Sequence, residues 1–268
     1  MTQQNFFLKI LEHFVRSNIY IFILSRFIVS KFFTKYIFES DFKILKILKK
    51  NSYFDDLTKP IIDIGANDGI SYKSIRNFLT KNIIISFEPL KFEFEELKKL
   101  KKKDVNYKIY NCGLSNVKSD SQKLFVPYFK QYPLSPFSGI NKTSITFRLK
   151  ESLFVKNLLK IIHFKINLIK LKKLDHFNLK PSLIKIDIEG NEFECILGGI
   201  QTIKKNKPIL LIEYNQNTNM KINKILKKFG YRSYYYDNKS DSIKLHNKEK
   251  IFNIIYIDIK KIKLAKNL

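Results

Sequence analysis

The chain has 268 residues, enough for one α/β domain of ordinary size plus a modest extension. Its hydrophobic fraction of 44% is sufficient for a packed core and excludes a disordered protein. The formal net charge of +26 would suit a nucleic-acid partner, but the excess is lysine spread along the whole chain with little arginine, so we predict no specific nucleic-acid binding.

The N-terminal residues 2–50 have the pattern of amphipathic helices. Apolar side chains recur at three- to four-residue spacing over residues 6–15 and 27–37. We interpret residues 1–54 as a helical extension that covers one side of the main domain. Because lysines flank a face rich in Phe and Ile, peripheral membrane contact through residues 2–50 is the alternative. The apolar run at 19–29 is too short to span a bilayer.

From residue 55 the pattern changes to strands that alternate with helices. Residues 61–64 form a short apolar run typical of a buried parallel strand, and a helical pattern follows over 70–80. Between them stand Gly65 and Gly69, where a Cβ would block either the turn or the approach of a ligand. Such a turn presents backbone N–H groups and the positive end of a helix to a nucleotide-like ligand.

The alternation continues to the C-terminus, with one interruption at residues 116–172. We expect further strands at 83–87, 107–110, 183–187, 209–213, 231–236 and 251–258, and helices at 91–102, 191–204 and 218–228. In the interruption, Ile145, Phe147 and Ile166 suggest extended pieces of an insertion that lies on the acceptor side. Residues 55–268 are therefore predicted to form a Rossmann-like α/β domain, with a mostly parallel seven-stranded sheet and helices on both faces.

Polar side chains stand at the carboxyl ends of these strands, where doubly wound sheets bind their ligands. They are Asp63, Glu88, Asn111, Asp187, Glu189 and Glu213. Glu88 lies 19 residues after Gly69, where an acid accepts the ribose hydroxyls of either NAD or S-adenosylmethionine. The loop has Asn67 and Ile70 in place of the glycines of a dinucleotide motif, and Asp63 would face a pyrophosphate badly. Asp63 suits a cofactor with ammonium and sulfonium charges, so S-adenosylmethionine is favoured.

Several of these motifs resemble those of the FkbM-type methyltransferases, in the same order and over roughly residues 58–235. The matching segments are Asp63-Ile64-Gly65-Ala66-Asn67-Asp68-Gly69, Phe87-Glu88-Pro89, Gly113-Leu114-Ser115, Leu174-Asp175, Lys185-Ile186-Asp187-Ile188-Glu189-Gly190-Asn191-Glu192 and residues 208–213. The block that begins at Lys185 is the most specific, although Asn191 stands where the family usually has a small residue. The resemblance implies a class I fold that uses S-adenosylmethionine, generally to methylate an oxygen on sugars or natural products.

The resemblance also implies a role for each matching residue. Asp63, Gly65, Ala66, Asn67 and Gly69 would line the methionine half of the cofactor. Glu88 would hold the ribose, Asn111 and Cys112 would lie near the adenine, and Asp187 would lie beside the methyl group. The segments 1–50 and 116–165, which would select the acceptor, carry no family motif.

Methyl transfer to a hydroxyl requires alignment of the acceptor and removal of its proton. Asp187 or Glu189 is the candidate base; the alternative is that Asp187 only binds cofactor and Glu189 only favours the start of the following helix. Lys185 shares a strand face with Asp187, so we expect it to pair with Asp187 or Glu213 and keep them ionised. The carboxylates Asp187, Glu189 and Glu213 could also bind a hard cation, but their spacing does not require one and we predict no metal.

The predicted function is therefore O-methylation of a small-molecule, carbohydrate or glycolipid acceptor. One rival is an NAD-type oxidoreductase, disfavoured by the missing third glycine and by the lack of a placed Tyr–Lys or His base. The other is a basic membrane- or nucleic-acid-binding module without catalysis, motivated by the charge and by residues 2–50. The two cysteines, Cys112 and Cys195, give no disulfide framework, so a cytoplasmic location is expected, with a possible membrane-peripheral contact.

Overall fold

The computed structural model of the chain describes residues 13–28, 40–155, 157–215, 218–247, 249 and 251–264. The chain splits into a smaller unit, residues 1–37 and 123–168, and a larger unit, residues 38–122 and 169–268. Each unit buries its own hydrophobic residues. The helices predicted at 6–15 and 27–37 lie mostly outside the described residues. Among the helices of the described part of the chain, none has both the length and the apolar character needed to cross a bilayer.

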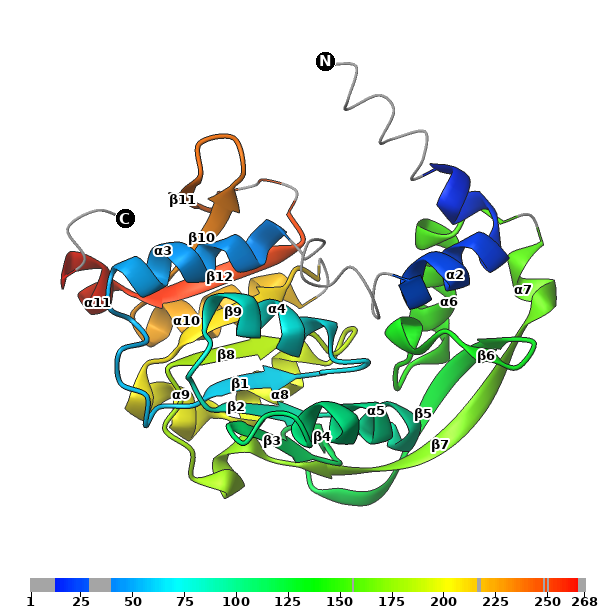
Figure 1. The fold of residues 1–268 in the computed structure, drawn as a ribbon, viewed down its shortest axis with the longest axis horizontal. Helices are drawn as coiled ribbons and strands as arrows, with labels where there is room; N and C mark the ends of the chain where they lie inside the picture. The colour runs from blue at the N-terminus through cyan, green and yellow to red at the C-terminus, as the bar shows by residue number, and fades with distance from the viewer. Residues whose placement is uncertain are drawn as a thin grey trace. The chain divides into compact units, whose positions relative to one another are not determined.

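The larger unit is built on an eight-stranded sheet, drawn as arrows in Figure 1, with strand order β11-β10-β12-β9-β8-β1-β2-β3. The strands are β1 Ile61–Ile64, β2 Ile84–Phe87, β3 Tyr107–Tyr110, β8 Leu183–Ile186, β9 Ile209–Glu213, β10 Tyr231–Asp237, β11 Ser242–Leu245 and β12 Asn253–Asp258. Five neighbouring strands are parallel to one another: β3, β2, β1, β8 and β9. The pairings of β9 with β12, β12 with β10 and β10 with β11 are antiparallel. The strand order reverses between β1 and β8, which makes the carboxyl ends of these strands a topological switch point.

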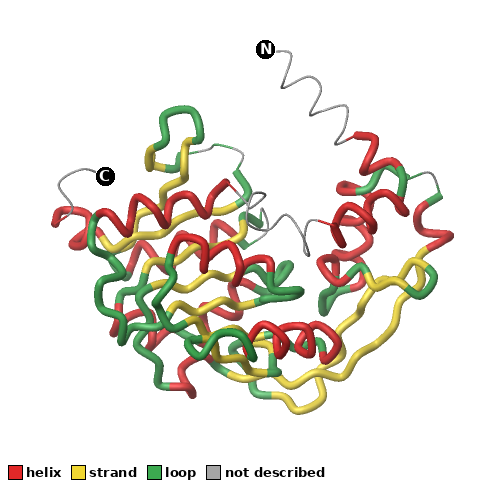
Figure 2. Tube along the Cα trace, viewed as in Figure 1, coloured by secondary structure: helices red, strands yellow, loops and turns green. Residues whose placement is uncertain are grey.

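Helices cover both faces of this sheet (Figure 2) because successive strand residues point to opposite sides. In β1, Ile61 packs with the helices α3 Ile44–Lys50 and α4 Ile70–Phe78, whereas Ile62 packs with α8 Glu192–Gly198, α9 Ile200–Asn206 and α10 Asn219–Lys228. The helix α5 Lys91–Lys101 and the last helix α11 Ile259–Leu264 add Leu100 and Ile262 to the first of these cores.

In its described residues, the smaller unit combines helices with the distal parts of two long strands. Its elements are α2 Ile19–Ile28, α6 Lys142–Ser152, α7 Leu158–Ile161, β6 Tyr132–Pro133 and the 3-10 turn η3 Ser135–Phe137. The strands β5 Ser119–Phe129 and β7 Ile162–Lys172 each begin in one unit and end in the other, and they form a second sheet in the order β4-β7-β5-β6, with β4 at Gly113–Leu114. Ile145 and Leu149, one helical turn apart on α6, are fully buried in this unit's core.

The predicted α/β fold is confirmed, with differences that have local causes. The sheet has eight strands because β11 extends its antiparallel end. Ile145 and Phe147 lie in helix α6 rather than in extended pieces, since the Asn141 side chain accepts hydrogen bonds from two backbone N–H groups of the first turn. The single helix predicted at 191–204 is two helices, α8 and α9, which are separated at Gly199.

The unit boundaries differ from the predicted boundary at residue 54. The 3-10 turn η2 Ser40–Lys43 and helix α3 belong to the larger unit, where Phe42, Leu45 and Leu48 are buried against the sheet. The predicted insertion at 116–172 contains the whole 123–168 segment of the smaller unit. Its placement beside an acceptor stays a prediction.

Candidate functional site

The turn between β1 and α4 lies at the switch point, because β1 pairs with β2 on one side and with β8 on the other. Gly65, Asn67 and Gly69 all adopt positive φ angles, of 78°, 48° and 83°. The turn is held by backbone bonds, in which Gly65 N–H donates to the Phe87 carbonyl over 3.0 Å and Gly69 N–H donates to the Ala66 carbonyl over 2.9 Å. This stretch needs glycine for its backbone conformation.

The packing of the protein itself also requires glycine at position 65, whereas at position 69 a Cβ would displace the end of a leucine side chain. A Cβ on Gly65 would overlap the Asp187 carbonyl oxygen at the end of β8, and a Cβ on Gly69 would lie 2.6 Å from Leu100 of α5. The sequence suggested two reasons for these glycines, the turn itself and the close approach of a ligand. These contacts support the first reason. The close approach of Gly65 to Asp187 brings two predicted site residues together across neighbouring strands.

Glu88 lies directly after β2 and is only 4% exposed. Its Oε2 accepts a hydrogen bond from Asn67 N–H, and its Oε1 accepts one from Leu90 N–H, each over 2.8 Å. Burial raises the pKa of the Glu88 carboxyl to about 8. When it is ionised, the Glu88 carboxylate has about four acceptor positions, of which these two bonds occupy two. The structure places Glu88 beside the glycine turn, and its contact with a ribose stays a prediction.

Asn111 and Cys112 follow β3 on the far side of Glu88. The Asn111 side-chain amide donates to the carbonyls of Glu88 and Pro89, over 2.9 and 3.1 Å, and so fixes the chain after β2. Cys112 is buried in the core beside α8, and this burial raises the pKa of its thiol to about 11. The thiol is therefore neutral at physiological pH and offers an apolar surface. Proximity of these two residues to an adenine stays a prediction.

A row of buried polar side chains crosses the sheet below α4. Asp63 is paired in register with Ser86 of β2 and with Lys185 of β8. Its Oδ2 accepts hydrogen bonds from Ser71 Oγ over 2.7 Å and from Ser86 Oγ over 3.2 Å. Asp63 is fully buried, so its carboxylate is directed at protein groups. The predicted contact of this carboxylate with a cofactor therefore stays a prediction, and Asp63 anchors the other members of the row.

Lys185 connects this buried row to the exposed edge of the sheet. Its Nζ lies 3.4 Å from Asp63 Oδ1 and 3.3 Å from Asp187 Oδ2, and it donates to the Gly65 carbonyl over 3.3 Å. The Lys185 side chain is 5% exposed, whereas that of Asp187 is 30% exposed. The predicted pairing of Lys185 with Asp187 is confirmed, and Asp63 is a second partner that the sequence did not indicate.

Three carboxylates meet at the ends of β8 and β9. Asp187, Glu189 and Glu213 each offer an oxygen within 4.8 Å of the other two, and all three residues are partly exposed. Glu189 adopts a φ of 59°, and Gly190 N–H donates to Glu192 Oε1 over 2.8 Å, which fixes this loop. Burial raises the pKa of the Glu192 carboxyl. Such a group of oxygens can accept several hydroxyl hydrogens or bind one hard cation.

Two exposed aromatic residues that the sequence did not indicate, Tyr214 and Phe252, belong to the segments at the end of β9 and the start of β12. Tyr214 directly follows Glu213, and its N–H donates to the Phe252 carbonyl over 2.7 Å. The Phe252 side chain is 84% exposed, and the Tyr214 ring lies 6.4 Å from the His246 ring. A signal existed for Tyr214 alone, because it directly follows a predicted strand, where side chains are often exposed. The pairing of the segments around residues 214 and 252 depends on the order of strands in the sheet, which the sequence alone does not predict.

Comparison with known proteins identifies a family. A family model described as the methyltransferase FkbM domain matches residues 63–233, which is more than half of the chain. Nothing among curated proteins matches the chain.

Solved structures show weaker likenesses. The methyltransferase FkbM from Methylobacillus flagellatus KT is 14% identical, with a TM-score of 0.47 over 87% of this chain and 59% of that one. The precorrin-6y C5,15-methyltransferase from Geobacter metallireducens GS-15 is 13% identical, with a TM-score of 0.34 over 77% of this chain and 83% of that one. An rRNA methylase from Streptococcus thermophilus is 9% identical, with a TM-score of 0.38 over 80% of this chain and 95% of that one. The chain thus spans 59% of the length of the first of these proteins.

Proposed function

Because this chain belongs to the methyltransferase FkbM domain family, we propose that it transfers the methyl group of S-adenosylmethionine to a hydroxyl oxygen of a carbohydrate-containing or natural-product acceptor. The observation that carries this proposal is the placement of Asp187. Its partly exposed carboxylate pairs with Lys185 at the switch point, and its backbone carbonyl lies against Gly65 of the glycine turn.

The residues around the turn support S-adenosylmethionine as the cofactor. Glu88 keeps acceptor positions for two ribose hydroxyls, and the carboxylates at this edge favour a cofactor that carries positive charge. A dinucleotide would instead need a glycine at the start of α4, where Ile70 stands. When bound, S-adenosylmethionine supplies an activated methyl group on a sulfonium.

Side chains of this protein align the acceptor and remove the proton from its hydroxyl. Asp187 is the group that accepts the proton of the acceptor hydroxyl, because its carboxylate is reachable from solvent and its position is fixed by Lys185. Glu189 and Glu213 accept hydrogen bonds from further hydroxyls and so align the acceptor for in-line attack. Removal of the hydroxyl proton by Asp187 makes the acceptor oxygen the nucleophile.

A carbohydrate acceptor is supported by the two exposed aromatic residues in the segments at the end of β9 and the start of β12. Sugars present hydroxyls that donate to carboxylates, and apolar C–H faces that pack on aromatic rings. Tyr214 directly follows Glu213 in the chain, Phe252 is joined to Tyr214 by a backbone hydrogen bond, and both rings are exposed. A flat hydroxylated natural product would use the same two kinds of contact.

The proposal is tested in two steps on the full chain. Isothermal titration calorimetry compares S-adenosylmethionine, S-adenosylhomocysteine and NAD, and we expect micromolar binding of the first two and none of NAD. Binding of NAD alone would support the oxidoreductase instead. A screen of sugars and glycolipids with methyl-tritiated S-adenosylmethionine then identifies the acceptor. The matched control is Asp187→Asn, which keeps the cofactor contacts but lacks the base.

A further inference from the structure

Exposed apolar side chains gather in the smaller unit. Among the described residues, twelve of the twenty large apolar side chains that are exposed belong to it, although it supplies only about a quarter of the described residues. Exposed apolar groups on this scale mark surfaces that contact another apolar phase or partner.

Helix α6 shows this most clearly. Its inward face buries Ile145 and Leu149, as expected for a helix on a core. Phe147, on another face, is 64% exposed, and Lys150 follows it by three residues on the same side. Phe154, just beyond the helix, is 47% exposed. The outward side of α6 therefore carries an exposed aromatic side chain and an exposed basic one.

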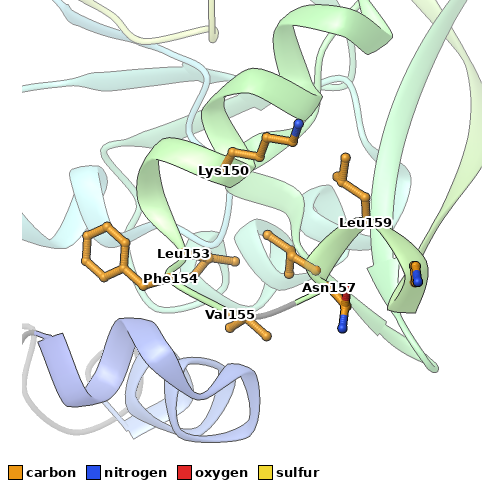
Figure 3. A pocket seen from close by; sticks show the side chains of 8 residues that line it. Lys150, Leu153, Phe154, Val155, Asn157 and Leu159 are labelled. Carbon is orange, nitrogen blue, oxygen red and sulfur yellow. The ribbon is translucent and has the colours of Figure 1, made fainter.

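A pocket of 420 Å³ opens beside the end of α6 (Figure 3). Its lining is mostly apolar and comes from the α6–α7 connection, with a lysine from each helix. The lining residues are Lys150, Leu153, Phe154, Val155, Asn157, Leu158, Leu159 and Lys160. Leu153 and Leu158 are buried, while Leu159 is exposed. The pocket is therefore an apolar hollow with cationic groups beside it.

The N-terminal helical residues border this region within the same unit. Phe154 N–H donates to the Arg16 carbonyl over 2.9 Å, and the Arg16 guanidinium lies 5.5 Å from the centre of the Phe154 ring. The His13 ring also stacks on the Phe154 ring, with the two ring centroids 5.3 Å apart. The Arg16 guanidinium is therefore a further cation next to the pocket.

The charge of the segment is almost entirely of one sign. Residues 123–168 contain eight Lys or Arg residues and a single acid, Glu151. A surface of this composition is complementary to an anionic partner. The interleaved phenylalanine and leucine side chains favour a partner that is also apolar beneath its charges, which describes an anionic bilayer better than a nucleic acid.

We propose that Phe147, Lys150, Phe154, Leu159 and Lys160, here named the α6–α7 surface, bind the surface of a membrane that contains anionic lipids. Phe147 and Leu159 enter the boundary between headgroups and acyl chains, and the pocket receives part of one acyl chain. Lys150 and Lys160 lie near the lipid phosphates. This surface is distinct from residues 2–50, which the sequence suggested for membrane contact, and the proposal does not depend on methyl transfer.

The absence of tryptophan from the sequence allows a direct test. Phe147→Trp places a single fluorescent reporter on the α6–α7 surface, and Phe252→Trp places one on a still more exposed site of the larger unit. We expect vesicles of equal parts phosphatidylcholine and phosphatidylglycerol to shift the emission of Trp only in the first variant. Lipids brominated in their acyl chains should quench it. No shift, an equal shift in both variants, or an equal shift with phosphatidylcholine alone would each overturn the proposal.

Charge variants separate this surface from the net charge of the chain. In vesicle flotation, Lys150→Glu combined with Lys160→Glu should weaken binding by well over tenfold, because each lysine near an anionic surface contributes roughly fivefold. Lys102→Glu combined with Lys103→Glu changes the charge equally at exposed positions of the larger unit and should have a much smaller effect. Equal losses in the two double variants would contradict a defined surface. Circular dichroism verifies that each variant is folded.

Discussion

The switch-point edge of the larger unit and the α6–α7 surface of the smaller unit use charge in opposite ways. At the edge, Lys185 and Asp63 are buried and lie within 3.4 Å of each other, so each fixes the position of the other. On the α6–α7 surface, Lys150 and Lys160 are exposed beside apolar side chains. A buried ion pair fixes the positions of side chains that a reaction needs. Exposed lysines can instead adjust to the mobile headgroups of a lipid surface.

The largest effect that we expect concerns the carboxylate at the edge. Asp187→Asn removes the proton acceptor while keeping the size of the side chain, so turnover should fall by about a thousandfold. Affinity for S-adenosylhomocysteine, measured by calorimetry, should change only a few-fold. A variant with near-normal turnover would show that Asp187 only binds cofactor, which was the alternative open from the sequence.

Loss of the buried cation should be almost as costly. Lys185→Met leaves Asp63 fully buried without its ion-pair partner, which should lower the free energy of unfolding by about 3 kcal/mol. Urea denaturation measures this, with the exposed Lys103→Met as the control. The pH profile of turnover should also change, because Lys185 positions Asp187. An unchanged stability and pH profile would contradict the role given to the buried row.

Glu88 should make the stability of the ligand-free protein depend on pH. Its pKa is raised to about 8 in the folded state from 4.5, so between these values the native protein holds a proton that the unfolded chain has lost. Stability should therefore fall as pH rises from about 5 to 8, with a slope of at most about 1.4 kcal/mol per pH unit. Glu88→Gln should flatten this dependence in thermal or urea unfolding, and an identical slope in both proteins would exclude Glu88 as its source.

The smallest effect on the free energy of unfolding is expected for a substitution on the α6–α7 surface. Phe147→Ser removes a side chain that is 64% exposed, so the free energy of unfolding should change by less than about 0.5 kcal/mol. Vesicle binding should nevertheless fall. A loss of stability comparable to that of Lys185→Met would show that Phe147 is a structural residue, and the contrast between the two regions would disappear.

The sequence was sufficient for the parts of the fold that local patterns determine. Apolar runs ended by glycine or an acid predicted the parallel strands, and the residues at their carboxyl ends predicted which side chains would stand at the edge. The Lys185–Asp187 pair could be predicted because two residues on one strand with one residue between them share a face.

Other features depend on contacts between distant segments. Asp63 and Lys185 are neighbours only because β8 returns to pair with β1, and Ser86 joins them through the register of β2. The sequence alone does not predict which strands are neighbours or which residues they pair. Helix α6 was missed because Ile145 and Phe147 favour strands, whereas the cap at Asn141 and burial of Leu149 decide for a helix.

The most direct test of the central claim is a crystal structure of the protein with S-adenosylhomocysteine. The account predicts the ribose hydroxyls in hydrogen-bond contact with the Glu88 carboxylate, and the amino-acid portion beside the turn at residues 65–69, close to Asp187. A ligand bound elsewhere, or a ribose that makes no contact with Glu88, would contradict it.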